Sequence, residues 1–151
     1  MTVVILLTQM NLMELNSYVN TSLFPKHFYS YNTFLLNLYW KQGCRDALGM
    51  ESGAITDGQI SASSQWDDNH AAIQGRLHFK QVGAKKGAWS AQTNNVNQWL
   101  QIDLNGYFTL TNVASQGRNG LGQWVTKYKL QYSTDGTNFM YYQEHGTDKV
   151  K

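Results

Sequence analysis

Residues 124–144 read WVTKYKLQYSTDGTNFMYYQE, and this stretch decides the fold class. Its first part alternates, and the face expected to be buried carries Trp124, Thr126, Tyr128, Leu130 and Tyr132. A period of two residues is typical of a strand with one buried face. The pair Asp135-Gly136 then separates two aromatic-rich runs, which indicates a β-hairpin. The stretch therefore predicts two antiparallel strands joined by a tight turn.

The same alternation occurs upstream in QWLQIDL, residues 98–104. Leu100, Ile102 and Leu104 alternate with polar residues, and Asn105-Gly106 then turns the chain into YFTLTNVAS. Short strands separated by turn signals, with no convincing amphipathic helix between them, indicate an all-β sandwich or barrel.

The overall composition is that of one folded domain. The chain has 151 residues, of which 42% are hydrophobic and 15% charged, so it can bury a core and is not expected to be disordered. The net charge of +2 is spread evenly along the chain. Without a basic face or tail, nucleic acid is not an expected partner.

The first 43 residues differ from the rest. They contain the only proline, Pro25, and a single glycine, Gly43, whereas the other twelve glycines follow. We interpret residues 1–43 as a leader, a linker or a gene-model extension. The run VVILL at residues 3–7 is too short for a convincing signal peptide or a membrane span. Asn20 begins a glycosylation sequon, which matters only if this segment enters the secretory pathway.

Six blocks after Gly43 carry a family resemblance. In chain order they are CRDALGMESGAITDGQISASSQW, GRL, GAW, QWLQIDL, ASQGR and WVTKYKLQYSTDGTNF. Their order resembles that of discoidin domains, also called coagulation factor five/eight type C domains. The resemblance implies a jelly-roll β-sandwich of the galactose-binding type, with ligand loops at one end. Such domains occur in secreted and cell-surface proteins and bind sugars, phospholipid headgroups, collagen or other glycoproteins.

The end of the sequence departs from this family pattern. The resemblance implies a disulfide between Cys44 and a cysteine near the C-terminus, but Cys44 is the only cysteine here. We therefore expect residues 44–151 to form a partial discoidin domain that lacks its last strands, either a fragment or a truncated gene model. Missing strands would leave unpaired edges and an exposed apolar face.

Three loops are candidates for the ligand site. The first carries Trp66, Asp67, Asp68, Asn69 and His70. A tryptophan beside hydrogen-bonding groups suits sugar or collagen recognition. In the alternative interpretation, Trp66 caps the end of the sandwich and the polar residues after it only form a turn.

The second and third loops carry the basic residues. Lys85 and Lys86 suit an anionic lipid, at about 1 kcal/mol for each basic residue, or are simply solvated. In the third loop Gln116, Arg118 and Asn119 lie among glycines, and collagen-binding members of the family use an arginine at the position of Arg118. Its guanidinium can hold a carboxylate, phosphate or sulfate. The alternative is an ion pair between Arg118 and a loop acid such as Asp67 or Asp68.

No catalytic pattern is found. The chain has no G-x-S-x-G elbow, its four histidines form no zinc spacing, and the glycines near Arg118 spell no dinucleotide motif. We expect no enzyme, cofactor or metal, and we assign Trp89, Trp99 and Trp124 to the core.

The leading hypothesis is an extracellular adhesion module that binds a glycan or a glycoprotein, collagen-like in character, with avidity from oligomers or tandem domains. The first alternative is peripheral binding to anionic phospholipid, ranked second because only Trp66 is an obvious apolar loop residue. The other alternative is a non-catalytic targeting domain of a larger enzyme.

Overall fold

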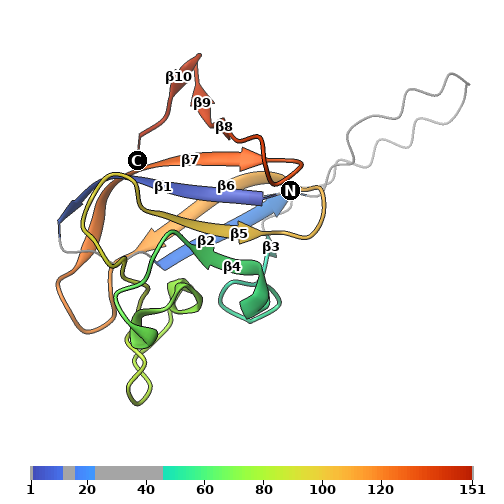
Figure 1. The fold of residues 1–151 in the computed structure, drawn as a ribbon. Helices are drawn as coiled ribbons and strands as arrows, with labels where there is room; N and C mark the ends of the chain where they lie inside the picture. The colour runs from blue at the N-terminus through green and yellow to red at the C-terminus, as the bar shows by residue number, and fades with distance from the viewer. Residues whose placement is uncertain (1, 12–15, 23–45, 151) are drawn as a thin grey trace, which may run out of the picture.

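The computed structural model describes residues 2–11, 16–22 and 46–150 (Figure 1). Cys44 therefore lies outside the described residues. The elements are β1 (Thr2–Asn11), β2 (Asn16–Ser22), β3 (Asp46–Ala47), η1 (Asp57–Gln59), β4 (Ile60–Ala62), η2 (Asp68–His70), η3 (Ala72–Gly75), β5 (Trp99–Asp103), β6 (Thr109–Gln116), β7 (Trp124–Ser133), β8 (Met140–Tyr141), β9 (Gln143–Glu144) and β10 (Thr147–Asp148). Within the described ranges the only helices are short 3-10 turns.

The strands form two main sheets that enclose one core. The larger sheet has the order β4-β5-β1-β7-β8 and the smaller one the order β3-β2-β6, while β9 and β10 form a separate hairpin. Leu110 of β6 packs against a buried cluster to which β5 contributes Leu100 and Ile102. Both sheets therefore contribute to one core, and the predicted all-β sandwich is confirmed.

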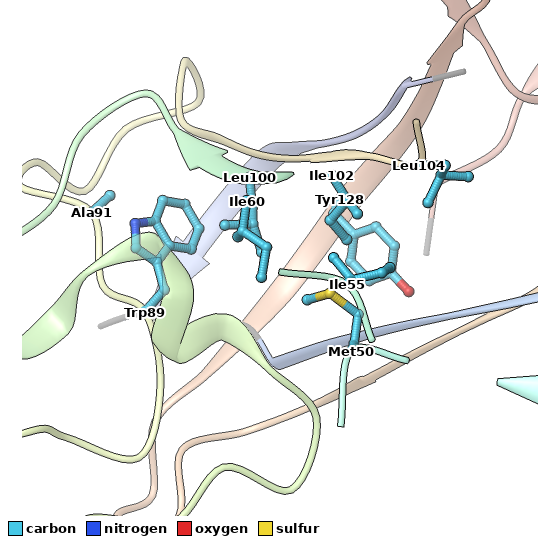
Figure 2. Packing of buried hydrophobic residues seen from close by; sticks show 9 residues of the cluster. All are labelled: Met50, Ile55, Ile60, Trp89, Ala91, Leu100, Ile102, Leu104 and Tyr128. Carbon is cyan, nitrogen blue, oxygen red and sulfur yellow. The ribbon is translucent and has the colours of Figure 1, made fainter. Parts of the chain in front are cut away.

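Strand β5 shows the predicted alternation. Leu100 and Ile102 have no exposed surface, whereas Asp103 is exposed. Figure 2 shows both residues in the cluster with Trp89, which is 1% exposed and is a core residue as predicted. The Trp89 Nε1–H donates to the Ser64 carbonyl at 2.8 Å, so the polar edge of the buried indole is satisfied. Trp99 is only half-buried because adjacent residues of a strand face opposite sides.

The hairpin predicted at Asp135-Gly136 is present. β7 and β8 pair antiparallel, with Tyr132 opposite Met140, and Gly136 has a φ of +75°. The Asp135 carboxylate accepts hydrogen bonds from the backbone N–H groups of Thr137 and Asn138 at 2.9 and 2.8 Å. The turn is thus held by a side chain as well as by the freedom of glycine at positive φ.

The assignment of Trp124 to the core was wrong. Tyr128 is buried as predicted, but Trp124 is 55% exposed and Val125 packs on the core instead. The pairing of β7 with β1 shifts register between Lys127 and Val125. Because such a bulge reverses which residues face inward, strict alternation fails at the start of β7.

Two strands come from the first 43 residues. β1 pairs antiparallel with both β5 and β7, and β2 lies between β3 and β6. Asn20, the sequon residue, belongs to β2 and lies opposite Ala47 and Asn112. The domain boundary near Gly43 stays a prediction, and the strands before it are hydrogen-bonded to strands that follow it.

Candidate functional site

The three predicted ligand loops meet and form a rim at one end of the sandwich. We call residues 65–70 the first loop, residues 79–87 the second loop and residues 117–123 the third loop, and all three together the rim. In Figure 1 the second loop is the yellow-green hairpin that projects furthest from the sheets.

Backbone hydrogen bonds join the first loop to the second loop and the chain after it. The Lys86 N–H donates to the Asn69 carbonyl at 2.8 Å, and the Ser90 N–H donates to the His70 carbonyl at 3.2 Å. The Trp66 N–H in turn donates to the Ser90 carbonyl at 2.8 Å. Since these bonds involve only the main chain, they hold the two loops together whatever the exposed side chains contact.

The third loop closes against the second one. A Cβ atom added to Gly87 would lie 2.7 Å from the Asn119 Cβ, so the two loops are in close contact. Within the third loop, Arg118 donates to Gln123 from its backbone N–H and from Nη1, both at 2.9 Å. Gly120 has a φ of +83°, which favours glycine at this bend. Gln116 ends β6 and leads the chain into the loop.

The acids of the first loop make local hydrogen bonds. Asp67 Oδ1 accepts from the Asn69 N–H at 2.8 Å and lies 2.6 Å from His70 Nδ1. The hydrogen bond from His70 lowers the pKa of the Asp67 carboxyl, and partial desolvation opposes this effect. Asp68 accepts a hydrogen bond from Gln65 Nε2 at 3.1 Å. Asp67 and Asp68 thus shape a turn, which is the alternative interpretation given above for these residues.

The outer surface of the rim is apolar at one exposed residue in each loop. Trp66 is 63% exposed, Val82 68% and Leu121 56%. The sequence reading identified only Trp66. Val82 and Lys85 exchange backbone hydrogen bonds at 3.1 Å around the two-residue turn Gly83-Ala84, and this turn carries Val82 outward. The available sequence signal for the exposure of Val82 was its position directly before the Gly83-Ala84 pair.

The predicted basic residues belong to the second and third loops of the rim. Lys85 is exposed at the turn of the second loop, while Lys86 is half-buried beside the first loop. Arg118 is also half-buried and Asn119 is exposed. Apart from Gln116, which ends β6, the predicted site residues therefore belong to the rim, and their role in ligand binding stays a prediction.

A polar network centred on the buried side chain of Gln98 lies next to the first loop. The sequence analysis did not predict it. Gln98 Oε1 accepts hydrogen bonds from the hydroxyls of Ser63 and Ser64 at 2.8 and 2.6 Å. Gln98 Nε2 donates to Asn95 Oδ1 at 2.9 Å and to Thr93 Oγ1 at 3.2 Å. Gln98 is 6% exposed, and its partners Ser63 and Ser64 immediately precede the first loop. No pattern in the sequence marks this glutamine, because its partners are brought together only by folding.

The described part of the chain holds neither a metal-ligand cluster nor a membrane-spanning helix. Residues 2–11, 16–22 and 46–150 contain no group of three or more His, Cys, Asp or Glu side chains arranged to hold a metal ion. In the same ranges, no helix is long and apolar enough to cross a membrane.

Comparison with known proteins supports the resemblance. The model of the F5/8 type C domain family matches residues 59–151. Lactadherin of Rattus norvegicus is 37% identical over 113 residues, which are 72% of this chain and 26% of lactadherin. Coagulation factor V of Sus scrofa is 39% identical over 116 residues, 72% of this chain and 5% of factor V. Retinoschisin of Homo sapiens is 36% identical over 110 residues, 68% of this chain and 48% of retinoschisin.

The chain thus spans less than half the length of each of these relatives. No solved structure gives a significant match.

Proposed function

Because the chain belongs to the F5/8 type C (discoidin) domain family, we propose that it is a non-catalytic extracellular recognition module whose rim binds an anionic phospholipid surface. Glycan or glycoprotein binding through the same rim is the second candidate. In either case the mechanism is contact without chemistry, and the module can be part of a longer polypeptide.

The exposure of Trp66, Val82 and Leu121 carries the proposal. These side chains come from three loops at the same end of the sandwich, so they can enter one surface together. Burying a side chain of this size contributes roughly 1.5 to 3 kcal/mol. The backbone bonds between the loops favour binding further, because little order is lost when the rim meets the surface.

The basic residues of the rim also favour binding to an anionic surface. Lys85, Lys86 and Arg118 belong to the same loops as Val82 and Leu121, and each basic residue near an anionic membrane contributes about 1 kcal/mol. The carboxylates of Asp67 and Asp68 oppose this attraction. Apolar insertion and charge are therefore both needed, and binding should weaken with added salt.

A different observation favours the second candidate. Trp66 is 63% exposed and is followed directly by polar residues whose turn is fixed by the Asp67 hydrogen bonds. An aromatic face beside ordered hydrogen-bonding groups suits a sugar ring. A single site of this kind is small, so useful affinity for a glycan would require several copies.

Liposome sedimentation tests the proposal. We expect pelleting with vesicles that contain phosphatidylserine, less pelleting at high salt, and none with neutral vesicles. The double variant Val82→Ser, Leu121→Ser should lose binding. Tyr107→Ser is the matched control, because Tyr107 is 81% exposed but precedes β6, at the opposite end of that strand from the third loop.

The outcomes separate the two candidates. If the chain never pellets with anionic vesicles, the lipid proposal is wrong. Binding to a glycan array or to collagen, lost in Trp66→Ala, would then support the second candidate.

A further inference from the structure

The centre of the large sheet is occupied by a strand from outside the family match. β5 and β7 lie within residues 59–151, which match the family model, whereas β1 does not. β1 pairs with β5 over Thr2 to Leu6 and with β7 over Thr2 to Asn11. Figure 1 shows β1 running between these two strands. The matched part of the chain therefore contains a gap one strand wide.

The register of β1 with β5 and β7 shows which positions of β1 lie on the core face of the sheet. Ile5 lies opposite Leu100 of β5 and Leu130 of β7. Leu100 is fully buried, and Leu130 packs against the same cluster. Val3, two positions away, lies opposite Ile102, which is also fully buried. Because directly opposed positions share one face of a sheet, the odd positions of β1 are those of the core face.

The even positions have different neighbours. Val4 lies opposite Gln101 and Gln131, and both glutamines are half-buried. The gap thus distinguishes alternate positions of the strand that fills it. Position 5 lies between two leucine positions of the core face, while position 4 lies between two glutamine positions of the other face.

The first part of β1 pairs regularly with two strands, whereas its last part pairs irregularly with one strand. Its first five residues are bonded on both sides, but beyond Leu6 only β7 pairs with it, with register shifts between Leu7 and Met10. From these observations we propose that the gap between β5 and β7 is a strand-acceptor site, and that Thr2–Asn11 occupies it as an exchangeable donor strand. The ligand class is an extended peptide with aliphatic residues at alternate positions. This proposal does not depend on the rim or its ligand.

Cleavage and exchange in the full chain test the proposal. A protease site replaces residues 12–15, the folded protein is cut, and a fluorescent peptide with the sequence of residues 2–11 is added in excess. We expect the cut strand to co-elute with the remainder in gel filtration and the labelled peptide to replace it. A peptide with Ile5→Lys should compete at least roughly tenfold more weakly, because the charge would enter the core face. The matched Val4→Lys peptide should compete nearly as well as the native one.

Each other result overturns the proposal. Loss of the cut strand from a remainder that keeps its melting temperature would show that the strand is dispensable. Loss of the strand with unfolding, or retention without exchange, would show that it is not exchangeable. Equal competition by the two lysine peptides would contradict the register.

A measurement on the unmodified chain covers the case in which the altered protein does not fold. Backbone amides of residues 3–6 should exchange with solvent as slowly as those of β5, because these residues are paired with a strand on each side. Immediate exchange at residues 3–6 alone would contradict the acceptor site.

Discussion

Gly87 lies so close to Asn119 that a Cβ atom on Gly87 would come within 2.7 Å of the Asn119 Cβ and 3.2 Å of its carbonyl oxygen. The two residues belong to different loops, and this contact closes the rim. The neighbouring atoms are backbone and Cβ atoms, which cannot move aside as the end of a flexible side chain can. The geometry of the rim therefore depends on the absence of a side chain at position 87.

We expect Gly87→Ala to displace the third loop. The cost should be about 1 to 3 kcal/mol in the free energy of unfolding, measured by chemical denaturation, because the added methyl group overpacks a close contact. Binding through the rim should fall several-fold in the sedimentation assay. Gly58→Ala is the control, since a Cβ atom there meets nothing within 4 Å. Equal effects of the two substitutions would argue against the contact between the loops.

The tryptophans provide a second comparison. Trp89 is 1% exposed, so Trp89→Ala should reduce the free energy of unfolding by about 3 to 5 kcal/mol. Trp124 is 55% exposed, and Trp124→Ala should cost clearly less. Thermal melts of both variants decide the matter. A loss at Trp124 as large as that at Trp89 would restore the assignment of Trp124 to the core.

Local patterns predicted much of this fold. The alternation of Leu100 and Ile102 and the turn at Asp135-Gly136 are local signals, and the structure has both features. The error at Trp124 has a physical cause, because a bulge depends on how two distant strands align. A single strand cannot reveal that register.

The candidate site was predicted less completely. The loops of Trp66, Lys85 and Arg118 are in contact in the structure, while the role of these residues in ligand binding stays a prediction. Val82 was missed because its exposure comes from the two-residue turn that follows it. Gln98 was missed because its hydrogen-bond partners are brought together only by folding.

The Gln98 network should stabilise the fold measurably. Gln98→Leu keeps much of the volume but leaves the hydroxyls of Ser63 and Ser64 without their shared acceptor. Each hydrogen bond lost costs about 0.5 to 1.5 kcal/mol, and Ser63 and Ser64 are half-buried, so we expect a total loss of about 1 to 3 kcal/mol in urea denaturation. Gln65→Ala is the control, because Gln65 is exposed and its side chain donates a hydrogen bond to the neighbouring Asp68. If Gln98→Leu leaves the free energy of unfolding unchanged, the network contributes little to stability.

The turn after β7 should make stability depend on acid pH. The pKa of Asp135 lies well below its usual range, first because the backbone N–H of Asn138 donates to its carboxylate, and then because the Asn138 side chain and the Thr137 N–H do so. In the unfolded chain the carboxyl titrates near its ordinary value of about 3.9. As the pH falls through that value, the unfolded state takes up a proton that the folded state does not, so the free energy of unfolding decreases.

Asp135→Ala removes this contribution. The variant should be less stable than the native chain at neutral pH, and its stability should decline less between about pH 5 and pH 2, so that the two curves converge in acid. Asp135→Asn retains one acceptor oxygen without a titratable group, so it should be more stable than the alanine variant at neutral pH and show the same shallow decline. Part of the slope will remain in both variants, since hydrogen bonds also lower the pKa of Asp67 and Asp148. Urea denaturation at a series of pH values measures these slopes, and a native slope in Asp135→Ala would show that the turn is not their source.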